Sequence, residues 1–206
     1  MPNNNFSLAL DMVLTSEGAK SRNKGNVDHP DDEGGRTGQG ITQTEYDRYR
    51  ARKGKPRQDV WLMLDEERDE IYQDNYWYPM NLDMVKRAAV SYLVFDSAVL
   101  HGVDWTRKAV QKAVHVKADG VIGPMTLAAL NAIDVKTFLD RMHDLRWARM
   151  QSKKSFPTFQ AGWAKRLADA RKNVLKVNKN LGEDVDIALP VTENLFDPFD
   201  RAKARC

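Results

Sequence analysis

Helix-type patterning runs through most of this 206-residue sequence, and glycines or prolines mark the ends of the patterned segments. The first segment has an apolar stripe that includes Phe6, Leu10 and Val13, and Gly18 follows it as a typical C-terminal cap. The predicted helices lie at about residues 6–18, 42–53, 65–76, 82–100, 104–114, from 124 onwards, 135–151 and 157–180. Residues 19–41, which are rich in Gly, Asp and Asn, are expected to form a loop with a short hairpin at its end. The sequence therefore predicts a mainly α fold with at most a small sheet.

The composition excludes several classes of protein. Apolar residues make up 42% and charged residues 30%, which is typical of a folded globular chain. The net charge of +3 is too small to indicate a nucleic-acid-binding protein. The single cysteine, Cys206, allows no intrachain disulfide and no cysteine-based zinc site. We expect no metal, no cofactor, no transmembrane segment and no signal peptide, and hence synthesis in a cytoplasm without an export signal.

Glu17 carries the most chemical information in the sequence. With Phe6 at zero on a helical wheel, Val13 lies at about 340° and Glu17 at about 20°, so Glu17 falls on the apolar stripe in the last turn. Apolar neighbours and the negative end of the helix dipole both raise the pKa of a carboxyl group. A protonated carboxyl is what general-acid catalysis requires. A Glu that turns to solvent at a frayed helix end is the alternative.

The loop after this helix supplies further carboxylates. Three consecutive acids at 31–33 precede four glycines within residues 34–40. A second carboxylate facing a protonated Glu is the arrangement used in glycoside hydrolysis. Calcium loops also combine acids and glycines, but the spacing here is not that of an EF-hand. At the end of the loop, Thr42 and Glu45 fit a capping box that starts the next helix.

Glu17-Gly18 followed by residues 31–42 (DDEGGRTGQGIT) resembles the signature of glycoside hydrolase family 108, the N-acetylmuramidases typical of phage endolysins. The chain departs from the family pattern at Ala19, where a second glycine is usual, and at Glu33, where a proline is usual. Three later segments resemble the peptidoglycan-binding part that follows in this family, including its closing helix. These segments are residues 92–102, 119–127 and 159–166.

The resemblance implies a role for each candidate residue. Glu17 corresponds to the general acid. The partner carboxylate is Asp31 if the phage-lysozyme spacing to Thr37 holds, or Asp32 if the family-108 spacing holds, and Thr37 helps to hold a water. The residues expected to contact substrate are Gln39, Asp96 and His101, which lie in the resembling segments, and Tyr76 and Trp77, whose aromatic rings could stack on sugar rings.

Several of these assignments have structural alternatives. Asp96 points inward on its helix, where a hydrogen-bonded core residue is the more common role. His101 could cap the carbonyls at the end of the same helix. Trp61 and Trp105 are expected in the core, and a turn centred on Asp119 has no necessary role beyond the turn itself.

The implied protein is a phage endolysin that hydrolyses the β-1,4 bond between N-acetylmuramic acid and N-acetylglucosamine in peptidoglycan. We expect a two-lobed, lysozyme-like α+β fold with a catalytic lobe at 1–81, a helical peptidoglycan-binding lobe at 82–182 and a tail at 183–206. The protein is expected to be a monomer that waits in the host cytoplasm until a hole in the membrane releases it. The alternatives are a lytic transglycosylase that uses Glu17 alone, a chitinase-like hydrolase, and a non-enzymatic wall-binding or secretion-accessory protein.

The last predicted helix has a lysine ridge opposite an apolar stripe that includes Trp163 and Val174. The ridge consists of Lys165, Lys172, Lys176 and Lys179. Such a ridge is most often a solvated surface, and its functional interpretation is attraction to an anionic envelope.

Overall fold

The computed structural model describes residues 5–16, 26 and 36–180, with the side chains of 178–180 excepted. The helices are α1 (Asn5–Ser16), α2 (Gln43–Arg52), α3 (Asp65–Tyr72), α4 (Ala88–His101), α5 (Val103–Ala113), α6 (Pro124–Ala132), α7 (Val135–Gln151) and α8 (Phe156–Asn180). The strands β1 (Thr37–Gly38) and β2 (Ile41–Thr42) form one antiparallel hairpin. The predicted mainly α fold with a small hairpin is thus confirmed.

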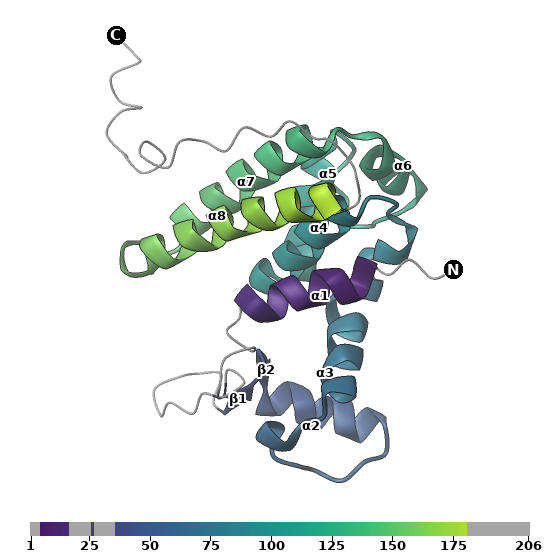
Figure 1. The fold of residues 1–206 in the computed structure, drawn as a ribbon, viewed down its shortest axis with the longest axis vertical. Coiled ribbons are helices and arrows are strands. Elements are labelled where there is room, and N and C mark those ends of the chain that lie inside the picture. The colour runs from purple at the N-terminus through teal and green to yellow at the C-terminus, as the bar shows by residue number, and fades with distance from the viewer. Residues whose placement is uncertain (1–4, 17–25, 27–35, 181–206) are drawn as a thin grey trace.

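Helix α4 lies at the centre of the larger part of the molecule (Figure 1), where it contacts α1, α5, α7 and α8. Because α4 is apolar nearly all round, it is buried on almost every side, as expected for a helix enclosed by others. Helix α2 and the hairpin lie in a smaller part, which α3 joins to the larger one. A single hydrophobic core runs through both parts.

Helix α1 buries the face that the sequence predicts. Leu10 and Val13 are buried and pack in the core beneath α1, which lies against α4. The described part of α1 runs to Ser16, and Glu17 is the next residue along the chain. Glu17 itself lies outside the described residues.

Local capping chemistry is confirmed at several helix ends. Thr42 and Glu45 form the predicted capping box of α2, and Pro124 occupies the first turn of α6. Asp119 accepts a hydrogen bond from the backbone N–H of Val121, and Gly120 has a φ of 84°, so this loop is the predicted turn.

Two predicted boundaries are wrong, and for the first a contact from a distant segment gives the reason. The helix expected from residue 82 begins only at Ala88, after a 3₁₀ turn at Leu82–Met84. The Asn131 side chain accepts a hydrogen bond from the backbone N–H of Lys86 at 2.8 Å, which holds this entry segment out of the helix. Likewise α3 ends at Tyr72 and continues as a π turn at Gln73–Trp77 instead of as regular helix.

No helix in the described ranges has both the length and the apolar character needed to cross a membrane.

Candidate active site

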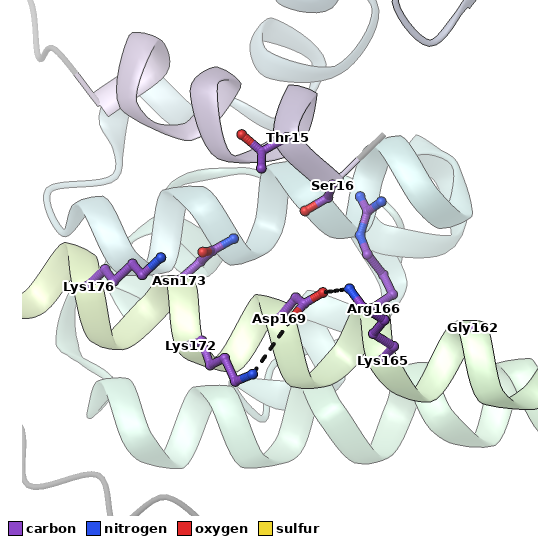
Figure 2. Close-up of a pocket in the computed structure, with 9 residues that line it drawn as sticks. All are labelled: Thr15, Ser16, Gly162, Lys165, Arg166, Asp169, Lys172, Asn173 and Lys176. Carbon is purple, nitrogen blue, oxygen red and sulfur yellow. Dashed lines mark hydrogen bonds and ion pairs between the residues drawn. The ribbon is translucent and has the colours of Figure 1, made fainter. Parts of the chain in front are cut away.

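A polar pocket of about 390 Å³ lies where α1 ends (Figure 2). On one side it is lined by Thr15 and Ser16, the last two residues of α1. The opposite side is formed by α8, which contributes Gly162, Lys165, Arg166, Asp169, Lys172, Asn173 and Lys176. Since Glu17 is bonded to Ser16, the candidate general acid follows directly from the wall of this pocket.

The hairpin turns tightly at Gln39 and Gly40, whose φ angles are 53° and 81°. Positive φ at both central residues is the requirement of a type I′ turn, which suits a two-residue hairpin. Arg68 donates a hydrogen bond to Gln39 Oε1 at 2.6 Å, and the Tyr72 hydroxyl donates to the Gln39 backbone oxygen at 3.1 Å. Gln39 is only 4% exposed, so its side chain ties the turn to α3 and is not open to substrate.

Trp61 supports the hairpin from outside the core. Its indole N–H donates to the backbone oxygen of Thr37 at 3.0 Å, and the Arg36 guanidinium stacks 3.6 Å from its ring centroid. A Cβ atom on Gly38 would lie 3.3 Å from the Trp61 ring and 3.1 Å from the Val60 carbonyl oxygen, so the strand approaches this closely only with glycine. Trp61 is 38% exposed, and its predicted place in the core is therefore wrong.

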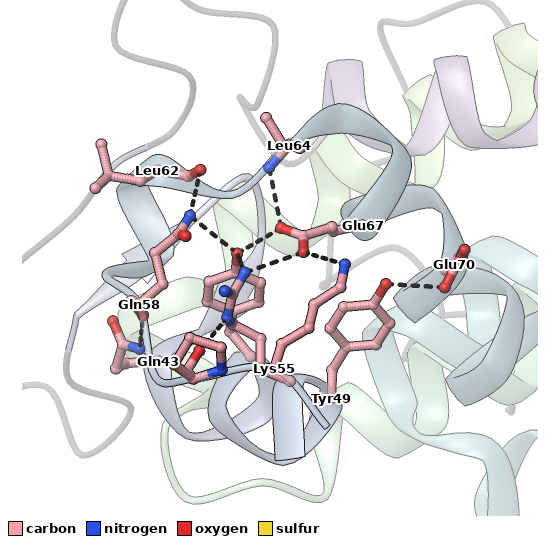
Figure 3. Close-up of polar contacts among 11 residues, drawn as sticks. Gln43, Tyr49, Lys55, Gln58, Leu62, Leu64, Glu67 and Glu70 are labelled. Atoms are coloured by element: carbon pink, nitrogen blue, oxygen red, sulfur yellow. Dashed lines mark hydrogen bonds and ion pairs between the residues drawn. The ribbon is translucent and has the colours of Figure 1, made fainter. Parts of the chain in front are cut away.

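A buried carboxylate fixes α2 to α3 in the smaller part of the molecule (Figure 3). Glu67 accepts hydrogen bonds from Arg50 at 3.0 Å, from Lys55 at 2.8 Å, and from the Tyr46 hydroxyl and the Leu64 backbone N–H. Burial alone would raise the pKa of Glu67, but the bonds from Lys55 and Tyr46 hold it below its usual range. An ionised Glu67 thus holds α2 and Lys55 against α3.

The two aromatic residues predicted to stack on sugars differ in exposure. Trp77 is 1% exposed, its ring meets Phe6 and Phe95 edge to face, and its N–H donates to Asp83 at 2.8 Å. The Trp77 ring is therefore part of the core and offers no face to a sugar. Tyr76 is half-buried, and it remains the candidate of the two for sugar stacking.

Asp96 is fully buried and binds two arginines. Arg146 donates to Asp96 Oδ2 at 2.6 Å, and Arg166 donates to Oδ1 at 2.7 Å. Burial alone would raise the pKa of Asp96, but the positive charges of Arg146 and Arg166 hold it below its usual range. A carboxylate that is 0% exposed cannot touch a glycan itself, although Arg166 extends from it to the pocket at the end of α1.

His101 lies at the end of α4 with its ring packed on Trp105, at a centroid distance of 4.7 Å. Neither ring nitrogen has a hydrogen-bond partner among the described residues, so His101 does not cap the helix carbonyls. Burial, followed by the positive charge of Arg146, lowers the pKa of His101 from 6.5 to about 3. A neutral, enclosed imidazole is poorly placed to bind substrate.

This buried imidazole predicts a pH-dependent loss of stability. Between about pH 6.5 and pH 3 the unfolded chain carries a proton on His101 that the folded chain does not, so stability falls as the pH is lowered through this range. Between pH 7 and pH 4, we expect the free energy of unfolding of the wild type to fall by up to about 3 kcal/mol more than that of His101→Phe. Urea unfolding of both proteins at the two pH values measures this difference, and parallel losses would show that His101 is not the titrating group.

The described site residues lie in separate parts of the molecule. Thr37 and Gln39 lie on the hairpin that is tied to α3, whereas Asp96 is connected through Arg166 to the pocket at the end of α1. His101 packs on Trp105, which lines a different pocket. Glu17, Asp31 and Asp32 lie outside the described residues, as do Cys206 and the tail, and the catalytic roles stay predictions.

The sequence interpretation missed both arginine partners of Asp96. Arg146 and Arg166 are buried or nearly so, with side chains 1% and 12% exposed. The available signal was Asp96 itself, because a carboxylate on the inner face of an apolar helix requires a cationic partner.

Comparison with known proteins agrees with this arrangement. The family model for glycosyl hydrolase 108 matches residues 10–102, which run from α1 through the hairpin to the end of α4. The solved structure of Brucella abortus SagA superposes with a TM-score of 0.70 at 31% sequence identity, covering 84% of this chain and 95% of that chain. No curated protein sequence matches. The chain therefore belongs to glycosyl hydrolase family 108, and it is a glycoside hydrolase that acts on peptidoglycan.

Proposed function

We propose that this chain is an N-acetylmuramidase of the phage endolysin type, with Glu17 as its general acid. The observation that carries the proposal is the position of Glu17 directly after α1, a helix whose apolar face is buried on α4 and whose last residue lines a polar pocket. The hairpin that carries Thr37 is anchored to α3 and to Trp61, which gives the second side of the site a fixed support. Release of reducing sugar from purified peptidoglycan, with chitin as the comparison polymer, tests the proposal. Binding without any soluble product would indicate a wall-binding protein instead, and anhydro-sugar products without reducing ends would indicate a lytic transglycosylase.

The proposed reaction uses two carboxyl groups and a water. Glu17 donates its proton to the glycosidic oxygen as the bond from C1 of N-acetylmuramic acid breaks, and positive charge develops on that sugar. Asp31 or Asp32 stabilises this charge or takes a proton from the attacking water, which Thr37 helps to hold. The two carboxyl groups can take different roles because their surroundings set their pKa values apart, one protonated and one ionised. The division into a catalytic lobe at 1–81 and a binding lobe at 82–182 belongs to the same proposal.

The two candidate partner acids should differ in importance. If one of them activates a water, Asp31→Ala and Asp32→Ala will have unequal effects on hydrolysis, one severe and one mild, because only one carboxyl can lie opposite Glu17 across the bond. A water-activating pair requires a carboxyl separation of about 6.5–9.5 Å, whereas a covalent route requires about 5 Å. Initial rates on purified peptidoglycan measure the difference. Full activity in both variants would remove the second carboxylate from the mechanism.

The lysines of α8 give the proposed enzyme a means of approaching its substrate. Attraction between a positive surface and an anionic envelope is long-range and is screened by salt, with a Debye length of about 10 Å at 0.1 M. Replacing Lys165, Lys172, Lys176 and Lys179 by Gln should weaken binding to whole envelopes, most strongly at low ionic strength. Sedimentation with envelopes across a salt series measures this. Equal binding by the variant and the wild type at every salt concentration would leave the ridge without that role.

The setting is also part of the proposal. An endolysin is made in the host cytoplasm, acts as a monomer and reaches the wall when a membrane hole opens.

A further inference from the structure

The pocket between α1 and α8 (Figure 2), here called the α1–α8 pocket, is strongly polar. Every lining residue except Gly162 is polar or charged. The lining includes one carboxylate, Asp169, and four cationic side chains, so its formal net charge is +3. The four cations are Lys165, Arg166, Lys172 and Lys176.

The charges in the pocket are only partly neutralised. Asp169 pairs with Lys165 at 2.7 Å and with Lys172 at 4.0 Å, so one carboxylate is shared between two ammonium groups. The side chains of Lys165 and Lys172 are 78% and 58% exposed, which leaves both able to contact a ligand. Among the described residues, Lys176 has no carboxylate partner. The lining therefore has spare positive charge facing the cavity.

One wall of the pocket is fixed by the core of the protein. Arg166 donates through Nε and Nη2 to Asp96, and Asp96 is held in turn by Arg146. Asn173 donates to the Tyr92 hydroxyl at 2.9 Å, which fixes a second polar side chain of α8. A polar site whose walls are already ordered binds a ligand with less entropic cost than a flexible surface does.

The pocket lies next to the candidate general acid, so the groups of a bound substrate near the cleaved bond are its nearest ligands. Ser16 lines the pocket and is bonded to Glu17, and consecutive Cα atoms are about 3.8 Å apart, so a glycan that is cleaved at Glu17 is bound close to the pocket. In peptidoglycan the muramic acid sugar carries a lactyl group, which ends either in its own carboxylate or in a peptide stem with carboxylates. Chitin carries no such group.

We propose that the α1–α8 pocket binds a carboxylate carried by the muramic acid residue of the substrate, either the lactyl carboxylate or a carboxylate of the peptide stem. The inference rests on the proposed muramidase function and adds a determinant of substrate choice to it. Charged hydrogen bonds from ammonium groups to a carboxylate favour this ligand over a neutral sugar. Long-range attraction to an envelope is screened by salt, whereas direct pairing in this pocket depends on the lysines that line it.

Binding of three disaccharides to the wild-type protein tests the proposal without any hydrolysis. The probes are chitobiose, N-acetylglucosaminyl-N-acetylmuramic acid, and the same disaccharide with a tetrapeptide stem. None of them contains the bond that the enzyme is proposed to cleave, so dissociation constants measured by NMR titration do not depend on catalysis. We expect at least one carboxylate-bearing probe to bind roughly tenfold tighter than chitobiose, and the preferred probe identifies the source of the carboxylate.

Matched variants separate the pocket from the general surface charge. Replacing Lys165, Lys172 and Lys176 by Gln should reduce the preference for the carboxylate probe by about tenfold, since each exposed charge pair contributes a factor of about 1.4–5. The control replaces Lys108, Lys112 and Lys154, three exposed lysines outside this pocket, and should leave the preference unchanged. Asp169→Asn removes the competing carboxylate and should tighten binding by about 1.4–5-fold.

The outcomes distinguish this proposal from the proposed function. Equal affinity of the wild type for all three probes would overturn the carboxylate site, and so would an equal loss in the pocket and control variants. Thermal unfolding of each variant shows whether it is folded, and the gain expected for Asp169→Asn cannot come from misfolding. If carboxylate binding behaves as expected while purified peptidoglycan releases no reducing sugar, the pocket stands and the muramidase function fails.

Discussion

Replacing Glu17 by Gln should reduce the hydrolysis of purified peptidoglycan by at least about 10²–10⁴-fold. The amide keeps the size of the side chain and much of its hydrogen bonding, but it has no proton to donate to the glycosidic oxygen. The substitution changes none of the buried residues of α1 that the structure describes, such as Leu10 and Val13. Initial rates of reducing-sugar release measure the effect, and thermal unfolding should stay cooperative.

The matched control for this variant is Asp11→Asn, which makes the same carboxylate-to-amide change on the exposed side of α1. We expect Asp11→Asn to retain nearly the wild-type rate. A folded Glu17→Gln protein with a rate close to that of the wild type would rule Glu17 out as the general acid. Equal losses in both variants would indicate a charge effect of the helix and not proton transfer.

Replacing Asp96 by Asn should destabilise the protein by about 3–5 kcal/mol, because removing one member of a buried ion network leaves uncompensated charge in the core. Asp96 is the carboxylate that both Arg146 and Arg166 bind, and Arg146 is almost completely buried. An amide at this position keeps the shape but supplies no negative charge to the two guanidinium groups. The loss should be visible in the free energy of unfolding in urea at neutral pH.

Asp144→Asn is the control for this substitution, since Asp144 is 80% exposed on α7 and, among the described residues, contacts just the neighbouring His143, at 3.5 Å. Its unfolding free energy should lie within about 0.5 kcal/mol of the wild type. If Asp96→Asn proves as stable as Asp144→Asn, the buried network contributes little to the fold. In that case the ordering of Arg166 in the α1–α8 pocket would also need another explanation.

The parts of the fold that are set by residues close together in the sequence could be predicted from it. The buried face of α1, the capping box at Thr42 and the turn at Asp119 follow from side-chain spacing and local hydrogen bonding. The later start of α4 could not be predicted, because the side chain that binds the entry segment is Asn131. Periodicity within residues 82–100 contains no information about a partner so far along the chain.

The candidate site shows the same limit. Periodicity places Asp96 on the inner face of its helix, but its partners Arg146 and Arg166 lie 50 and 70 residues further along the chain. Helical spacing predicts that the lysines of α8 share one side of the helix, and three of them do line one pocket. The end of α1 lies across the pocket from these lysines. This is a tertiary contact, so the sequence pattern of either helix by itself does not predict it.

Tryptophan burial is equally dependent on tertiary packing. The sequence favours Trp61 in the core and Trp77 as a candidate for sugar stacking, whereas in the structure Trp77 is buried and Trp61 is exposed. Trp77 is enclosed because the π turn lies against α4, and Trp61 is left at the surface because it covers the hairpin strand at Gly38. Both side chains are equally apolar, so composition and spacing cannot rank them.

The identity of the bond that is cleaved is tested most directly by mass spectrometry of the soluble products after wild-type enzyme digests purified peptidoglycan in ¹⁸O-labelled water. A muramidase that hydrolyses its substrate leaves N-acetylmuramic acid at the reducing end, with one labelled oxygen on its C1, and Glu17→Gln should release almost none of this product. Reducing-end N-acetylglucosamine, or an unlabelled anhydro-muramic acid end, would contradict the account.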